Sequence, residues 1–386
     1  MNPAQSQSIA EVREGLVAAA KKGPRELDRV LAERPWPFAI AGRALFVYRG
    51  PADEVFLQHW IYALSSAQPF ERVEGTDLWL LDTLLQRRAR VEYKLEVVHH
   101  GRQQLLSDPL NPNAARDPFG SNSVAVGPEY EQPEWAQPHD GVRSGQVIER
   151  QLKSDIFGDV RPIGIYLPPR YRETRRYPLV IAHDGFDYLR FSALKTVLDN
   201  LIERLELPQI IVALTQSPNR LEEYAASDRH ARFVVDELLP LLEGEFPLLE
   251  GAENRGLLGA SFGAVASLHA AWSRPGTFGR LFLQSGSFAF ADIGDHGRGP
   301  VFDPVVRWVQ QFREDPRHPA ERIQMSCGVY ESLIAYNRAM LPVLQGTGAD
   351  VRLSEDQDGH NWENWRDRLR EGLSWLFPGP FWMVYE

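Results

Sequence analysis

Residues 255–264 read RGLLGASFGA, and this stretch decides the fold of the larger part of the chain. The apolar residues before Gly259 predict a buried strand, and the small residues after Ser261 predict a helix, with the serine in the turn between them. Gly259 and Gly263 leave room for this crowded turn, which holds a serine in a strained backbone conformation. We therefore expect Ser261 to be the nucleophile of an acyl-transfer reaction, with the Phe262 N–H at the helix start as an oxyanion donor.

Outward from this turn, strands and helices alternate from residue 141 to the end of the chain. Near-continuous apolar strands between helices predict a mostly parallel sheet that is covered by helices on both faces. The predicted strands are 161–167, 177–182, 209–214, 256–258, 280–284, 323–329 and 350–355. The predicted helices are 193–206, 229–245, 262–271, 304–313, 333–345 and 362–376.

A serine nucleophile needs a base, and in this kind of fold the chain order is serine, acid, histidine. His360 lies in the turn between the last predicted strand and the last predicted helix, so we expect it to be the base. Glu331 follows the preceding strand and is the expected acid, which would orient the imidazole and stabilise its charged form. Asp358 is nearer in sequence, but two residues from His360 on one turn it is poorly placed to reach the ring.

The second oxyanion donor should come from the turn after the buried strand that ends at Ala182. Gly185 in this turn allows a close backbone approach, and the Phe186 N–H is the expected donor. His183 precedes Ser261 in the chain and lies at a strand end, so we expect it to have a structural role.

The first part of the chain follows a different pattern. Apolar spacing predicts one or two helices in residues 1–36, and short alternating strands separated by Gly, Pro and Asp then predict a small β-sandwich over 37–126. Residues 106–140 are rich in proline and lack periodicity, so we expect irregular structure and a domain boundary there, with a packed linker at 127–140 and the larger domain at 141–386.

Composition and charge exclude several classes of protein. A length of 386 residues, with 43% hydrophobic and 24% charged side chains, fits about two globular domains. The net charge of −10 argues against nucleic-acid or membrane-surface partners, because both present negative charge. No apolar run reaches the length of a membrane span, and the N-terminal segment lacks the pattern of a signal peptide, so we expect a cytoplasmic protein.

The sequence predicts no metal site and no cofactor. The pair His99-His100 has no carboxylate or cysteine at ligand spacing, so it is expected to be a solvated pair. Cys327 is the single cysteine, which excludes an internal disulfide, and its place in an apolar strand predicts a buried thiol. No phosphate loop or dinucleotide fingerprint is present.

With these residues placed, the chain resembles the enterochelin (enterobactin) esterase family, within the esterase-D-like α/β-hydrolases. The motifs that carry the resemblance are His183-Asp184-Gly185, Asn219-Arg220 with Glu223-Tyr224, Glu237-Leu238-Leu239-Pro240, Gly259-Ala260-Ser261-Phe262-Gly263, Gln284-Ser285-Gly286-Ser287-Phe288, and Gly359-His360-Asn361-Trp362 with Trp365; in the N-terminal part they are Gly75-Thr76-Asp77-Leu78-Trp79 and Ser107-Asp108-Pro109-Leu110-Asn111-Pro112.

The resemblance implies an α/β-hydrolase domain preceded by an immunoglobulin-like β-sandwich. It also implies a serine esterase that acts on a small-molecule ester, and family members cleave ferric catecholate siderophores inside the cell to release iron. Such a substrate is anionic, so Arg220, Arg229 and His230 are the cations expected near it, with Tyr224 as a further substrate-binding residue. Any iron would arrive with the substrate.

Two alternatives stay open from the sequence. Relatives with the same layout cleave carbohydrate esters such as feruloyl or acetyl xylan, so this chain could be a carbohydrate esterase or an acyltransferase on the same scaffold. A non-enzymatic alternative is a binding protein on a hydrolase fold whose chemistry has lapsed. The intact order of Ser261, Glu331 and His360 argues against that reading.

Overall fold

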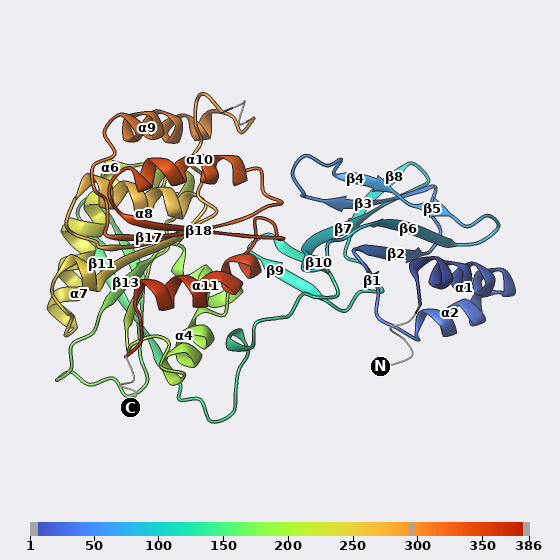
Figure 1. Ribbon diagram of the computed structural model, residues 1–386, viewed down its shortest axis with the longest axis horizontal. Coiled ribbons are helices and arrows are strands. Elements are labelled where there is room, and N and C mark those ends of the chain that lie inside the picture. Colours follow the sequence, from blue (N-terminus) through green and yellow to red (C-terminus); the bar gives the residue numbers. More distant parts are fainter. Residues whose placement is uncertain (1–6, 294–296, 381–386) are drawn as a thin grey trace. The chain divides into compact units, whose positions relative to one another are not determined.

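A computed structural model of the protein describes residues 7–293 and 297–380. The chain divides into two compact units (Figure 1). The N-terminal unit contains the chain up to Glu131 together with two short later segments, Val329–Ser332 and Asp356–Gly359. The C-terminal unit contains the remaining residues from Gln132 onward.

The N-terminal unit combines two helices with two antiparallel sheets. The helices are α1 (Ile9–Lys22) and α2 (Pro24–Leu31). One sheet has the order β1-β2-β6-β5, and the other has the order β4-β3-β7-β10-β9, with β8 also paired to β7. The strands are β1 (Phe38–Ile40), β2 (Arg43–Arg49), β3 (Glu54–His59), β4 (Ala67–Pro69), β5 (Glu71–Arg72), β6 (Leu78–Leu84), β7 (Arg90–His99), β8 (Arg102–Leu106), β9 (Ala114–Asp117) and β10 (Gly120–Val126).

Side chains of both sheets meet in one apolar core. Phe46 of β2 and Tyr93 of β7 pack edge to face, with ring centroids 5.1 Å apart. Alternate residues of β7 are buried, as the period of two in the sequence predicts. The helices cover a separate cluster, in which Leu16 and Leu27 pack with Leu45 and Leu78 of the first sheet.

The expectation of irregular structure from residue 106 is wrong for 114–126. Strands β9 and β10 form a hairpin there, and β10 lies inside its sheet between β7 and β9. The sequence around these strands is rich in proline and polar residues, so it shows no strand pattern. Their stability comes from hydrogen bonds and packing with neighbouring strands, which the local sequence does not reveal. Val124 and Ala125 are nevertheless buried in the core.

The C-terminal unit has a single eight-stranded sheet with the order β11-β12-β14-β13-β15-β16-β17-β18. The strands β14, β13, β15, β16 and β17 are parallel, and β11 and β12 run antiparallel at one edge. The bounds are β11 (Gln146–Ser154), β12 (Asp159–Leu167), β13 (Leu179–Ala182), β14 (Ile211–Leu214), β15 (Arg255–Ala260), β16 (Arg280–Gln284), β17 (Arg322–Gly328) and β18 (Asp350–Asp356).

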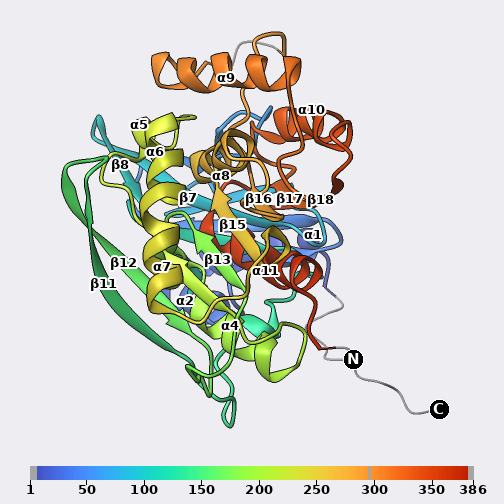
Figure 2. The ribbon, with the colours of Figure 1, turned by 90° about the vertical axis from the view of Figure 1, so that its left-hand side faces the viewer.

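Helices cover both faces of this sheet (Figure 2). One face is packed by α3 (Gly185–Phe191), α4 (Leu194–Glu203) and α11 (Trp362–Leu376). The other face is packed by α6 (Asp228–Arg232), the π-helical turn η3 (Phe233–Leu238), α7 (Leu239–Glu245), α8 (Phe262–Ser273), α9 (Asp303–Glu314) and α10 (Ile334–Gln345). The remaining elements are the short helix α5 (Arg220–Glu223) and the 3-10 turns η2 (Glu134–Ala136), η4 (Ala252–Asn254) and η5 (Pro300–Phe302).

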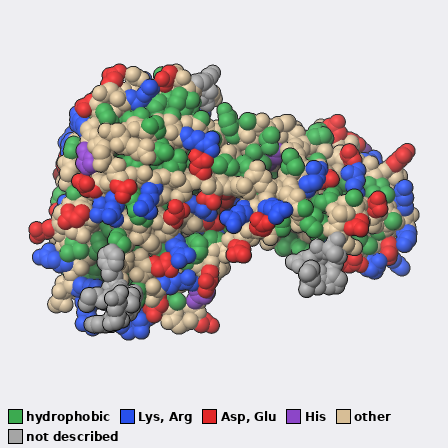
Figure 3. Space-filling view, viewed as in Figure 1, with side chains coloured by type: hydrophobic (Ala, Val, Ile, Leu, Met, Phe, Trp, Pro, Cys, Tyr) green, Lys and Arg blue, Asp and Glu red, His purple; other side chains and the backbone are tan. Residues whose placement is uncertain are grey.

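The alternation predicted from residue 141 onward is confirmed for the strands and helices that were named. The elements that were missed include the edge strand β11 and the short helices α3 and α5. No helix within residues 7–293 and 297–380 is both long and apolar enough to cross a membrane. Acidic and basic side chains are interspersed on the face drawn in Figure 3, so the net negative charge is not gathered into one patch there.

Candidate active site

Ser261 lies at the junction of β15 and α8, as the sequence predicts. Its backbone has φ 58° and ψ −118°, a strained conformation for a residue with a side chain. A Cβ at Gly259 would fall on the carbonyl group of Gly263, and a Cβ at Gly263 would lie 3.2 Å from the Cβ of His183. Glycine is therefore required at 259 by the close approach of strand and helix, while a side chain at 263 would press on His183.

A second serine lies against the first. The Ser261 and Ser287 hydroxyl oxygens are 3.1 Å apart, within hydrogen-bond distance. The Ser287 N–H donates to the Ser261 carbonyl oxygen at 3.2 Å, and the Ser261 N–H donates to the Gln284 carbonyl oxygen at 2.8 Å. Ser287 is fully buried. Sequence reasoning did not single it out as a site residue, although its signal was present as a small-residue segment directly after β16.

The turn after β13 carries the second predicted oxyanion donor. Asp184 adopts a left-handed conformation with φ 53°, and α3 begins at the next residue. The Gly185 N–H donates to the Thr215 carbonyl oxygen at 2.8 Å, so this group is engaged within the fold. A Cβ at Gly185 would lie 2.6 Å from the Cα of Leu214, which explains the glycine. The Phe186 N–H follows as the next amide in the turn.

Arg220 connects this turn with the end of β15. Its Nε donates to Asp184 Oδ2 at 2.7 Å, and a terminal nitrogen donates to the Ala260 carbonyl oxygen at 3.2 Å. Burial raises the pKa of the Asp184 carboxyl, and the Arg220 guanidinium opposes that rise. The guanidinium thus binds both Asp184, which precedes Gly185, and Ala260, which precedes Ser261.

Tyr224 is fully buried and belongs to a cluster of aromatic and imidazole rings. Its ring centroid lies 5.1 Å from that of His183 and 4.9 Å from that of His230. The two imidazoles are joined at 3.0 Å through their Nε2 atoms, and His183 Nδ1 is 3.0 Å from the Ser267 hydroxyl. The Ser267 hydroxyl donates its single proton to the Gly263 carbonyl oxygen, so its oxygen accepts the Nδ1–H of His183. The Nε2 atom of His183 then carries no proton and accepts the Nε2–H of His230.

Burial keeps both of these histidines neutral. It lowers the pKa of His183 to about 4 and that of His230 well below its ordinary value. His183 therefore supports the helix that follows Ser261, in agreement with the structural role expected for it.

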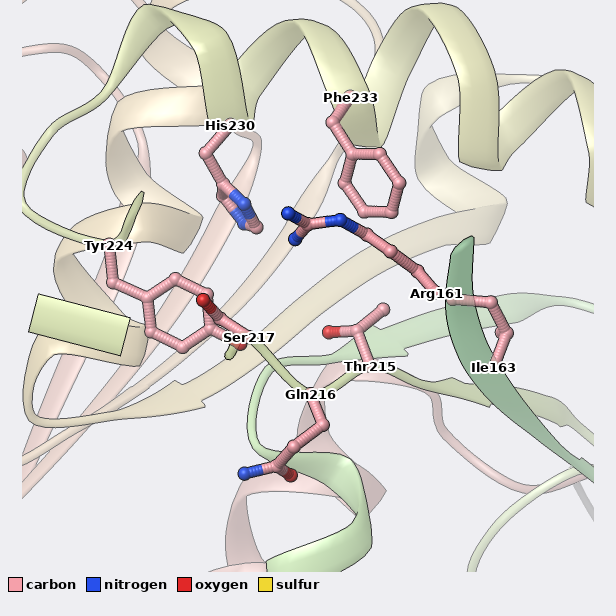
Figure 4. A pocket seen from close by; sticks show the side chains of 8 residues that line it. All are labelled: Arg161, Ile163, Thr215, Gln216, Ser217, Tyr224, His230 and Phe233. Atoms are coloured by element: carbon pink, nitrogen blue, oxygen red, sulfur yellow. The ribbon is translucent and has the colours of Figure 1, made fainter. Parts of the chain in front are cut away.

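A small pocket opens beside this cluster (Figure 4). The Arg161 guanidinium points toward His230 in this view, and two oxygens of Glu223 accept from it at 2.7 and 2.8 Å. The lining residues are Arg161, Ile163, Thr215, Gln216, Ser217, Tyr224, His230 and Phe233. The positive charge in the pocket is thus balanced by a buried carboxylate.

Arg229 lies on the outside of α6. Its Nε and a terminal nitrogen donate to the Ile156 carbonyl oxygen at 3.0 and 2.8 Å, and its guanidinium lies over the Phe157 ring. The side chain is exposed. Arg229 and Arg220 are therefore held by different parts of the C-terminal unit, each through protein groups.

The predicted base and acid lie in the loops where the sequence places them. His360 is exposed in the loop between β18 and α11, with its ring edge-on to Trp365 at 5.1 Å. Glu331 is buried in the turn after β17. Ser261, Glu331 and His360 thus follow the carboxyl ends of β15, β17 and β18. Glu331 belongs to the N-terminal unit and His360 to the C-terminal unit.

Asp358, the alternative acid, binds a buried arginine. Its Oδ1 accepts from the Arg90 guanidinium at 3.4 Å and from the Gly359 N–H at 2.7 Å. Arg90 is almost completely buried and also binds Glu92 at 3.1 Å. The carboxylate of Asp358 therefore neutralises a buried cation.

No carboxylate lies at ligand spacing from His99-His100 along the chain, but the fold brings one to the pair. Asp53 lies beside the pair, with one ligand atom of each residue within 4.8 Å of the others. Spacing along the chain could not show this, because Asp53 comes from the start of another strand.

A strained serine at a strand–helix junction, with a left-handed turn after the neighbouring strand of a parallel sheet, is the arrangement typical of serine hydrolases. The chain belongs to the family described as "putative esterase", whose sequence profile matches residues 154–376. It is accordingly a carboxylic-ester hydrolase.

The relatives confirm the predicted resemblance to enterochelin esterases. The iron(III) enterobactin esterase of Escherichia coli O6:H1 is 24% identical over 348 residues, covering 81% of this chain and 85% of that protein. The uncharacterized protein YjcH of Bacillus subtilis is 28% identical over 247 residues, covering 60% of this chain and 97% of that protein. The crystal structure of a ferric enterobactin esterase from Salmonella typhimurium superposes with a TM-score of 0.73 at 22% identity, covering 86% of this chain and 93% of that one. This last similarity shows a shared fold.

Proposed function

We propose that the protein is a serine esterase that hydrolyses the ester bonds of catecholate siderophores through Ser261, His360 and Glu331. The observation that carries the proposal is the backbone of Ser261, which is strained at the carboxyl end of a central parallel strand and directly precedes a helix. The names of relatives that match most of the chain, the iron(III) enterobactin esterases, support the substrate.

In the proposed reaction, the Ser261 hydroxyl oxygen attacks the ester carbonyl while His360 accepts its proton. Glu331 orients the imidazole and stabilises its charged form. The N–H groups of Phe262 and Phe186 bind the developing oxyanion. His360 then returns the proton to the leaving alcohol, and water hydrolyses the acyl-enzyme by the same route.

Substrate binding is proposed for Arg229, Arg220 and Tyr224. Arg229 is exposed and offers a positive charge to an anionic substrate. Arg220 and Tyr224 would act by holding Asp184 in place. Arg220 binds the Asp184 carboxylate, and the Tyr224 hydroxyl accepts from the Asp184 N–H at 3.4 Å. We also propose that the N-terminal unit is an immunoglobulin-like domain, since it has two antiparallel sheets around one core.

The first experiment compares hydrolysis of a short p-nitrophenyl ester by the wild type and by Ser261→Ala. We expect a burst of product from the wild type that is lost in the variant, and labelling of Ser261 by a fluorophosphonate probe. A folded wild type that neither turns over nor becomes labelled would overturn the esterase mechanism.

The second experiment tests the substrate with a panel of esters. It compares ferric and iron-free enterobactin with feruloyl and acetyl xylan esters. The proposal expects the highest kcat/KM for a catecholate ester. A preference for a carbohydrate ester would contradict the proposed substrate but leave the proposed catalytic residues unaffected.

A further inference from the structure

The N-terminal unit brings two histidines and a carboxylate together at one end of its larger sheet. Asp53 directly precedes β3, and His99 ends β7. The strands pair with Glu54 opposite Val98, so the antiparallel register places Asp53 opposite His99. The Asp53 N–H also donates to the Val98 carbonyl oxygen at 2.8 Å, which holds this strand end in place.

The donor atoms of this cluster are available. One ligand atom from each of Asp53, His99 and His100 lies within 4.8 Å of the others. His99 Nδ1 is buried, and within residues 7–293 and 297–380 no side chain or backbone group forms a hydrogen bond with it. The Asp53 carboxylate accepts the His100 backbone N–H at 2.7 Å through Oδ2, which orients the carboxylate beside the two imidazoles.

The turn that carries His100 is unusual for a histidine. His100 and Gly101 have φ values of 49° and 71°, and they connect β7 to β8 as a two-residue hairpin loop closed by the pair His99 and Arg102. Such loops favour Asn-Gly, because both positions need a left-handed backbone. Histidine tolerates this conformation better than most residues do, and here it brings the His99 and His100 ring centroids to 3.9 Å.

We propose that Asp53, His99 and His100 form a binding site for a divalent transition-metal ion of the zinc class. Two imidazoles and one carboxylate suit such an ion, and three protein ligands leave a fourth position for water. A bound ion would cross-link the β7–β8 turn to the start of β3. It would therefore stabilise the N-terminal unit against unfolding by mass action.

The test uses the full-length chain after removal of metals with EDTA. Titration with Zn²⁺ in a calorimeter should show one ion bound per chain, and Co²⁺ should give the visible absorption of a tetrahedral site. His100→Asn is the sharpest variant, because asparagine keeps the turn and removes the imidazole. We expect His100→Asn and His99→Gln each to weaken Zn²⁺ binding at least about tenfold.

The matched control is His318→Gln, which removes an exposed histidine of the C-terminal unit. This variant should bind Zn²⁺ like the wild type. Zn²⁺ should also raise the unfolding temperature of the wild type and not that of His100→Asn. Absence of one-to-one binding, or equal binding by the wild type and both site variants, would overturn the proposal. Both outcomes are independent of ester hydrolysis.

Discussion

At the scale of single residues, the glycines around Ser261 show how little freedom the catalytic turn has. Gly259 faces the backbone of Gly263 with no space for a Cβ. Gly244, on α7, has open space around its Cα within the described part of the chain. The two positions therefore form a matched pair for substitution by alanine.

We expect Gly259→Ala to lower the free energy of unfolding by about 3 kcal/mol or more and to abolish hydrolysis, because the Cβ meets backbone that cannot move aside. Gly244→Ala should stabilise α7 by up to about 1 kcal/mol. Urea unfolding of both variants measures the difference. Equal stabilities would contradict the crowded turn.

Ser287 gives a second test at this scale. Removal of its hydroxyl in Ser287→Ala should lower kcat by up to about tenfold, since one hydrogen bond that positions the Ser261 oxygen is lost. KM should change little, because the group is buried behind the nucleophile. Steady-state kinetics with a p-nitrophenyl ester measure both constants. An unchanged kcat in a folded variant would show that the contact has no role in positioning.

At the scale of elements, Arg220 links two turns that must keep their relative position. We expect Arg220→Met to lower kcat and also to lower the free energy of unfolding by about 3 kcal/mol, because Asp184 loses its partner while buried. Arg220→Lys should recover part of both losses. If Arg220 acted only on an anionic substrate, KM would rise while stability stayed unchanged, and unfolding curves beside kinetics distinguish these cases.

The sequence pattern was sufficient to predict some strands and helices but not others. The buried strands β13 to β17 were predicted because each is a short run of buried residues that a predicted helix follows. Strands β9, β10 and β11 were not, because their stability depends on neighbours in the sheet and their sequences are largely polar. Helix α3 was missed since it is only seven residues long and begins directly after a left-handed aspartate at a strand end.

At the scale of the whole molecule, buried neutral histidines make stability depend on pH. Burial lowers the pKa of His183 and of His269 to about 4, below the value of about 6.5 expected in the unfolded chain. A depressed histidine pKa means that the unfolded chain binds protons first as pH falls. Stability should therefore decrease on acidification below about pH 6.5 and continue to decrease until the folded histidines titrate.

Between about pH 7 and about pH 5, we expect each such histidine to account for a loss of about 2 kcal/mol. His183→Phe should be less stable than the wild type at about pH 7 but should lose less on acidification. Asp184, Arg220 and His230 neighbour this position and remain in both proteins. Urea unfolding at both pH values measures the difference, and identical pH slopes would contradict the assignment.

The sequence was sufficient to predict most of the helices and strands of the C-terminal unit, although not β11, α3 and α5, together with the serine turn and the loops that hold His360 and Glu331. These features are local, since they follow from apolar periodicity and from glycines in one short segment. Tertiary structure alone decided which distant groups meet: Ser287 against Ser261, Arg220 between Asp184 and Ala260, and Asp53 beside His99 and His100. The physical reason is that sheet register and strand order create these contacts, and neither is encoded in the spacing of residues along the chain.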